Sequence, residues 1–171
     1  MNCRAERDTM IFTGPFGYKA NYEAMVWFLR EVYPIIQATI PHLRLTITGD
    51  HAGLPLPLAT NVTLTGFVQD VRPLIAQSWI SLAPLRTGGG TRLKILEAMA
   101  LGTPVVATTK GAEGLDVKPG EHLLIGDTPE AFAQAVIRLC REPGLHQHLA
   151  QKALITVNEK YDWRATMPRF L

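Results

Sequence analysis

A run of three glycines, Gly88, Gly89 and Gly90, precedes Thr91 and a segment of helical period, RLKILEAMA. Because glycine has no Cβ, such a backbone can approach a bound group closely, and the start of a helix offers free N–H groups and a positive dipole. This arrangement favours the binding of phosphate, with a diphosphate as the natural ligand. A flexible loop without a ligand is the alternative interpretation, and these residues alone leave both open.

Two common phosphate fingerprints do not describe this loop. A P-loop requires Gly-x-x-x-x-Gly-Lys-Ser/Thr, which is absent from the loop. The dinucleotide pattern Gly-x-Gly-x-x-Gly lacks its third glycine here, and the loop follows the fourth predicted strand rather than the first.

Glu97 is a carboxylate within the otherwise apolar segment LKILEAMA. Seven positions separate it from Gly90, so the two lie on one helical face about 10 Å apart along the axis. That distance spans a pyrophosphate and the adjoining ribose, whose two vicinal hydroxyls can donate to a carboxylate. The alternative is an ion pair of Glu97 with Lys94, three residues earlier, or with an arginine of another element.

The elements that position these residues follow from the hydropathy pattern. Short runs rich in β-branched residues alternate with longer segments of helical period, which is typical of βαβ units. The predicted fold is α/β: a Rossmann-like, doubly wound parallel sheet of about six strands in one domain over residues 1–171. The predicted strands are 9–14, 43–49, 62–66, 80–85, 104–109 and 122–125.

Helix boundaries are predicted from capping residues and prolines. The first helix is expected to begin with Asn21 as N-cap and to be bent or interrupted at Pro34. Asp70 and Thr128 are the expected N-caps of two later helices. The later predicted helices are 70–77, 91–100, 128–142 and 144–160. Since ligands of such sheets bind beyond the carboxyl ends of the strands, the strand-to-helix loops are the expected site.

The composition of the chain limits the classes of partner that it could bind. Seventeen Lys and Arg against fifteen Asp and Glu give a formal charge of +2, and their scatter indicates neither nucleic-acid binding nor a basic membrane patch. No run approaches the roughly 20 apolar residues of a membrane span, so a cytoplasmic location is expected. The chain has no Asp-x-Asp pair and no matched Cys/His set, so no metal is expected.

The string GGGTRLKILEAMALGTPVVATTKGAEGL, with IFTGPFGYKANYEAMVWFL before it and LTGFVQDV between, resembles the C-terminal domain of group 1 (family 4) glycosyltransferases. That domain binds a nucleotide sugar and forms one half of the GT-B architecture. The resemblance covers nearly the whole chain. It is closest to the branch with the pattern PLR-x-GGGTR-x-K-x-LEAMA, sugar transferases of surface-polysaccharide systems.

The resemblance implies roles for several residues. Two family glutamates stand eight positions apart, the first near the donor sugar and the second on the ribose. Glu97 matches the second, whereas the first falls at Gly89, so the backbone of the glycine loop is expected to take over part of its contact. The family also places an Arg and a Lys after the first strand, facing the diphosphate. In GPFGYKAN, Lys19 matches the lysine and Gly17 belongs to the donor loop, but no arginine is present.

Arg86 and Arg92 flank the glycine cluster, and either could supply the missing guanidinium, which binds phosphate bidentately. We favour Arg92, so Lys19 and Arg92 are the predicted catalytic residues. The alternatives are solvated surface arginines and an ordinary loop lysine. Val68 is expected where backbone groups of the family meet the base edge. Glu113 is expected where a glycine-rich turn approaches the donor, with a plain turn as its alternative.

The implied function is transfer from a UDP- or GDP-sugar to a glycan or lipid-linked acceptor, without metal and with retained anomeric configuration. Membrane contact is expected only indirectly, through a lipid-linked acceptor. GT-B enzymes hold the acceptor on an N-terminal domain that is missing here, so we expect negligible transfer by this chain alone. The alternatives are a non-catalytic nucleotide-binding module and half of a nucleotide-sugar epimerase.

Overall fold

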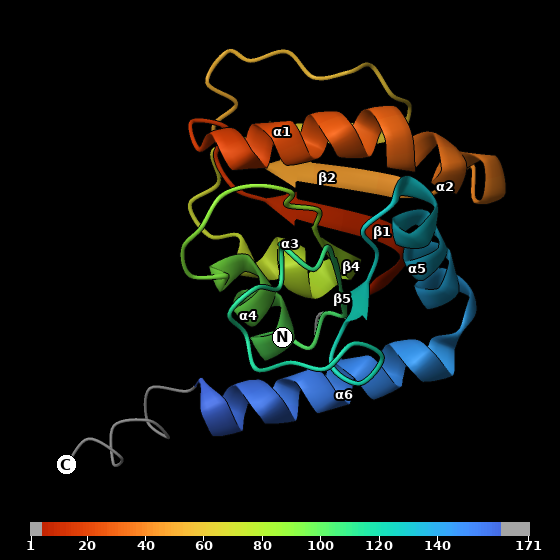
Figure 1. Cartoon of the computed structure of the whole chain (residues 1–171). Coiled ribbons are helices and arrows are strands. Elements are labelled where there is room, and N and C mark those ends of the chain that lie inside the picture. The colour runs from red at the N-terminus through yellow and green to blue at the C-terminus, as the bar shows by residue number, and fades with distance from the viewer. Residues whose placement is uncertain (1–4, 162–171) are drawn as a thin grey trace.

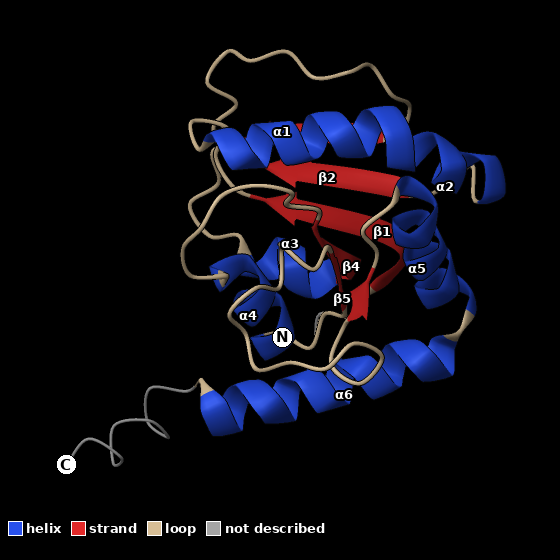
Figure 2. Ribbon diagram, in the orientation of Figure 1, coloured by secondary structure: helices blue, strands red, loops and turns tan. Residues whose placement is uncertain are grey.

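Six parallel strands form a single sheet in the order β3-β2-β1-β4-β5-β6 (Figures 1 and 2). The computed structural model describes residues 5–161. The strands are β1 (Glu6–Thr13), β2 (Arg44–Thr48), β3 (Val62–Gly66), β4 (Ser78–Ala83), β5 (Val105–Ala107) and β6 (Leu124–Ile125). All six predicted strands are confirmed, and so is the predicted α/β class.

The chain leaves β1 first toward β2 and later returns on its other side with β4. In open parallel sheets, ligands bind at such a reversal of strand order, outside the carboxyl ends of the strands. The topology therefore places the crevice for a ligand between the loops that follow β1 and β4.

Helices cover both faces of the sheet (Figure 1). One face carries α1, a π-helical turn η1, α2 and α5, and the other carries α3, α4 and α6. Their bounds are α1 (Lys19–Trp27), η1 (Phe28–Val32), α2 (Tyr33–Thr39), α3 (Arg72–Gln77), α4 (Leu93–Ala100), α5 (Pro129–Arg141) and α6 (Pro143–Lys160).

The central strand β1 shows why two helical layers are needed. Met10 and Phe12 pack into the cluster beneath α1 and α5, whereas Ile11 packs into the cluster beneath α3 and α4. All three side chains are fully buried. Side chains of a strand alternate between the two faces of the sheet, so a strand that is apolar at every position requires cover on both.

The first helix begins earlier than predicted. Tyr18 is the N-cap of α1, and Asn21, predicted to be the cap, lies within the helix and is buried. Its side-chain amide instead donates to the carbonyl oxygen of Pro15 at 2.9 Å. The propensity of asparagine for helix starts is overridden here by a tertiary role. The interruption predicted at Pro34 is confirmed, since η1 ends and α2 begins beside this residue.

Capping is clear in two later helices. Thr128 caps α5 as predicted, because its hydroxyl accepts from the N–H of Ala131 at 3.1 Å. Val71, rather than Asp70, is the N-cap residue of α3. Asp70 nevertheless accepts from the N–H of Arg72 at 3.0 Å and pairs with its guanidinium.

Candidate functional site

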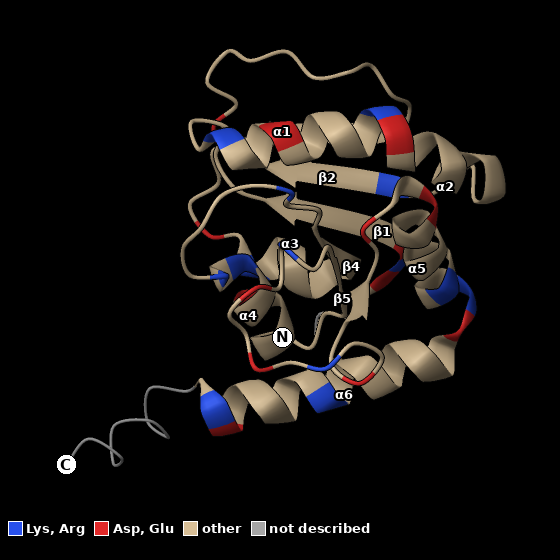
Figure 3. Cartoon of the chain, in the orientation of Figure 1, with Lys and Arg blue, Asp and Glu red and all other residues tan. Residues whose placement is uncertain are grey.

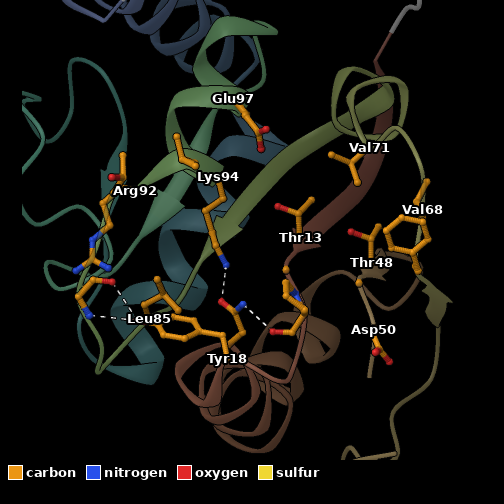
Figure 4. A pocket seen from close by; sticks show the side chains of 18 residues that line it. Thr13, Tyr18, Thr48, Asp50, Val68, Val71, Leu85, Arg92, Lys94 and Glu97 are labelled. Carbon is orange, nitrogen blue, oxygen red and sulfur yellow. Dashed lines mark hydrogen bonds between the residues drawn. The ribbon is translucent and has the colours of Figure 1, made fainter. Parts of the chain in front are cut away.

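A pocket of about 640 Å³ opens where β1, β2, β3 and β4 end and α4 begins (Figure 4). It lies at the reversal of strand order, as the topology requires. The loops after these four strands form its walls, together with the first turns of α1 and α4. The polar side chains that line it are Thr13, Tyr18, Asn21, Thr48, Asp50, Thr91, Arg92, Lys94 and Glu97.

Five of the residues predicted to bind the donor line this pocket: Val68, Gly89, Thr91, Arg92 and Glu97. They come from the loop after β3, the glycine loop and α4, so residues 29 positions apart in the chain (68 to 97) share one cavity.

Tyr18 holds the glycine loop in place. Its hydroxyl donates to the carbonyl oxygen of Gly89 at 3.0 Å and accepts from the Gly89 N–H at 3.2 Å. Gly88 and Gly90 have φ of +88° and +95°, a region that favours glycine. A Cβ at Gly88 would collide with the Tyr18 hydroxyl. The loop therefore has a specific conformation in which Tyr18 tethers Gly89.

Six predicted residues lie outside the lining of this pocket, among them Gly88, Gly90 and Glu113. Lys19 is exposed and forms an ion pair with Glu23, 3.3 Å away on the next turn of α1. The Arg86 guanidinium lies 5.4 Å from the centre of the Trp27 ring, beside a second cavity. Gly17 is exposed in the loop before α1.

Arg92 and Glu113 are brought together. Arg92 is the N-cap residue of α4, only 5% exposed, and its guanidinium lies 3.3 Å from the Glu113 carboxylate. Glu113 also pairs with Lys110 at 2.6 Å and lies outside the pocket lining. Arg92 is therefore no solvated surface residue, and Glu113 is its counter-ion.

Lys94 is the main residue of this pocket that sequence reasoning missed. Its Nζ donates to Oδ1 of Asn21 at 2.8 Å and lies 4.0 Å from the centre of the Phe12 ring. Figure 4 shows its side chain reaching down toward the start of α1. The alternative interpretation of Glu97, an ion pair with Lys94, is thus wrong. The available signals were a lysine in the first turn of an apolar helix and the lysine of the branch pattern, but no role beyond an ion pair with Glu97 was predicted for it.

The surroundings of Lys94 disfavour its charge. Burial, and after it the positive charge of Arg92, lower the pKa of Lys94 from 10.5 to about 7, while Glu97 acts in the opposite direction. The amine is therefore close to half protonated near neutral pH. A ligand with negative charge would shift it toward the ammonium form.

Glu97 keeps an available carboxylate. It lines the pocket from α4 and is exposed, and no residue of the described range 5–161 forms a hydrogen bond or ion pair with it. Thr48, across the pocket, has a buried hydroxyl that likewise lacks a hydrogen-bond partner among the described residues. Both groups can form hydrogen bonds with a bound molecule.

Further features concern metals, membranes and charge. Among the described residues, no three His, Cys, Asp or Glu side chains are grouped so that they could hold a metal ion. None of the described helices is long and apolar enough to span a bilayer. Figure 3 shows positive and negative residues interspersed along the described chain.

Comparison with known families identifies the relatives of this chain. The family model described as "Glycosyl transferases group 1" matches residues 7–142. An uncharacterized 44.6 kDa protein in the cps region of Klebsiella pneumoniae is 26% identical over 164 residues. That match covers 90% of this chain and 42% of the relative, so the chain spans less than half of the relative's length.

Solved structures share the fold. The C-terminal domain of the group 1 glycosyl transferase LpcC from Francisella tularensis matches with a TM-score of 0.74 and 19% identity, covering 93% of this chain and 89% of that one. HepE from Anabaena, solved in complex with UDP, matches with a TM-score of 0.78 and 17% identity, covering 96% of this chain and 47% of that one.

Proposed function

This chain belongs to the group 1 glycosyl transferases, and from this premise we propose that its pocket binds the nucleoside-diphosphate part of a nucleotide-sugar donor. The observation that carries the proposal is that Gly89, in the loop before α4, and Glu97, within α4, line the same pocket. One supplies a backbone that a phosphate can approach, and the other supplies a carboxylate for the ribose hydroxyls.

The base is assigned to the loop after β3. Phe67 is 81% exposed and lines the pocket beside Val68. An exposed aromatic ring at a pocket wall can stack on a base, while the backbone of Val68 is available for its polar edge. The donor is a UDP- or GDP-sugar, and the UDP complex of HepE supports this class.

The diphosphate is the leaving group of the proposed transfer. Its developing negative charge is stabilised by the first turn of α4 and by cationic side chains, which makes a divalent metal unnecessary. Transfer proceeds with retention to a glycan or a lipid-linked acceptor, and the cps-region relative supports a surface polysaccharide as the product class.

The acceptor is assigned to a second domain. The matched region is 47% of HepE and 42% of the Klebsiella relative, whereas it is 89% of the excised LpcC domain. These proportions support the proposal that residues 1–171 form the C-terminal, donor-binding half of a GT-B enzyme.

Isothermal titration calorimetry of the 171-residue chain with UDP, GDP, uridine and guanosine tests the proposal. We expect a diphosphate to bind more tightly than its nucleoside, with the same affinity in EDTA. Absence of binding by both diphosphates, or equal affinity for diphosphate and nucleoside, would overturn it. A strict requirement for a divalent metal would overturn the metal-independent mechanism alone.

A further inference from the structure

Lys94 is the lysine that the fold directs into the pocket, although it lies 75 positions after Lys19, the lysine expected there. We propose that Lys94, oriented by Asn21, is the cation that binds the diphosphate of the donor. The inference rests on the proposed function and names the residue that gives this site its preference for diphosphate over nucleoside.

The other candidate cations already have partners elsewhere. Lys19 is paired with Glu23, and Arg86 lies over the Trp27 ring. Arg92 has a buried Nε without a hydrogen-bond partner among the described residues, but its Nη2 is paired with Glu113. Lys94, by contrast, has a neutral partner. An ammonium group has three N–H donors, and the described residues accept one of them, through Asn21 at 2.8 Å. The remaining donors are available to phosphate oxygens.

Asn21 is the positioning residue. Its Nδ2 donates to the carbonyl oxygen of Pro15 at 2.9 Å, which leaves Oδ1 facing Lys94. Gly14 makes this possible, because a Cβ there would lie 2.5 Å from Asn21 Nδ2. The loop after β1 thus contributes to the diphosphate site through an amide that aligns a lysine of α4, rather than through a cation of its own.

The environment of Lys94 makes binding depend on pH. The charged or titratable groups that line the pocket with Lys94 are Arg92 at the N-cap of α4, Glu97 on α4, Asp50 after β2 and Tyr18 before α1, and of these Arg92 and Glu97 act on its pKa. Burial and Arg92 leave much of the amine neutral above pH 7. A bound diphosphate favours the ammonium form by its negative charge. Binding above pH 7 must therefore be accompanied by proton uptake at Lys94.

The first test compares two substitutions by calorimetry at pH 7. Lys94→Met removes the charge and keeps an apolar chain of similar length. Lys152→Met is the matched control on an exposed position of α6, outside the pocket. We expect Lys94→Met to weaken UDP binding by about 10- to 100-fold, since charged hydrogen bonds are worth about 1.5 to 3 kcal/mol. Uridine binding should change less than twofold, and Lys152→Met should behave as wild type.

The second test measures protons directly. UDP is titrated into wild-type protein at pH 8 in two buffers of different ionisation enthalpy. At this pH the terminal phosphate of UDP, with a pKa of about 6, is already ionised. We expect wild type to take up approximately one proton and Lys94→Met to take up almost none. Asn21→Leu removes the positioning amide and should weaken UDP binding. When proton uptake is measured over a series of pH values, this variant should reach half of the maximal uptake at a lower pH than wild type. The wild-type measurement remains decisive if a variant fails to fold.

The outcomes separate the two proposals. If wild type binds neither UDP nor GDP, the proposed function fails, and the role of Lys94 fails with it. If wild type binds UDP but Lys94→Met retains both the affinity and the proton uptake, the proposed function stands and the assignment of Lys94 is wrong. Equal loss of UDP and uridine binding would likewise contradict a role at the diphosphate.

Discussion

The Arg92 guanidinium and the Glu113 carboxylate lie 3.3 Å apart and join the start of α4 to the turn after β5. Arg92 is nearly buried, whereas the Glu113 side chain is more than half exposed. A buried guanidinium requires a counter-ion, so this pair stabilises the end of the glycine loop. The charge of Arg92 in turn lowers the pKa of Lys94.

Replacing Glu113 should change the acid stability of the protein. The pKa of Glu113 is held below 4.5, first by the hydrogen bond from Lys110 and the positive charge of Lys110, and then by the positive charge of Arg92. A carboxyl group with a depressed folded-state pKa stabilises the fold above its ordinary pKa, and this contribution is lost as the pH falls through the folded value. We expect the melting temperature of wild type to fall more between pH 6 and pH 3 than that of Glu113→Gln. Glu159→Gln on α6 should keep the wild-type slope.

Glu97→Ala should weaken UDP binding about tenfold or more while the fold survives. The carboxylate has no hydrogen-bond or ion-pair partner among the described residues, so the main loss is the ribose contact. Its removal also lowers the pKa of Lys94 further, because Glu97 raises that pKa. Calorimetry with UDP, and circular dichroism for the fold, provide the measurement. The control is Glu159→Ala. Unchanged affinity would contradict the ribose contact.

Tyr18→Phe should loosen the glycine loop. It removes both hydrogen bonds to Gly89 and leaves the ring in place. We expect faster amide hydrogen exchange over residues 86–91 and a loss of UDP affinity of about two- to tenfold, the range of neutral hydrogen bonds. Tyr161→Phe, which removes a hydroxyl that accepts from the Asp116 N–H on another part of the protein, should leave the loop unchanged. If the amides of residues 86–91 exchange at the wild-type rate in Tyr18→Phe, the hydrogen bonds of Tyr18 are not needed to order the glycine loop.

The unliganded protein should gain stability as the pH rises above 7. Lys94 has a folded pKa of about 7 against 10.5 in the unfolded chain. Between these values the unfolded state binds more protons, so the free energy of unfolding increases by up to about 1.4 kcal/mol per pH unit from this group. Lys94→Met should remove that slope and be more stable than wild type at pH 6. Denaturant titrations from pH 6 to 9 measure the free energy of unfolding of wild type and Lys94→Met, with Lys152→Met as the control.

The 171-residue chain should show negligible sugar transfer. Holding an acceptor hydroxyl in line with the anomeric carbon accounts for about 7 to 11 kcal/mol of barrier reduction in favourable cases, and we assign that role to a second domain. An assay with labelled UDP- and GDP-sugars and a panel of oligosaccharide and lipid-linked acceptors measures it. Robust acceptor-dependent turnover would show that this chain is sufficient for transfer. Nucleotide binding without turnover, also in a protein that contains the proposed second domain, would favour a non-catalytic module.

Secondary structure was accessible from the sequence because its causes are local. Runs such as residues 43–49 have the β-branched, apolar character of strands covered on both faces, and Thr128 combines a capping hydroxyl with a following proline. Glu97 and the glycine loop were candidates from residue type alone, because a carboxylate within an apolar helix is rare and glycine lets a backbone approach a ligand closely. The resemblance to a family was needed to choose the ribose and the diphosphate over an ion pair and a flexible loop.

What the tertiary structure decided was the direction and partner of each cation. Lys19 matched the family pattern, but Glu23 one turn later holds it on the exposed side of α1. Asn21 has the features of a helix cap, yet it contacts Lys94, which is 73 positions away. Such contacts depend on the strand order, which brings the loop after β1 beside the start of α4. A single sequence determines which residue types are available, but long-range packing determines which of them face the same cavity.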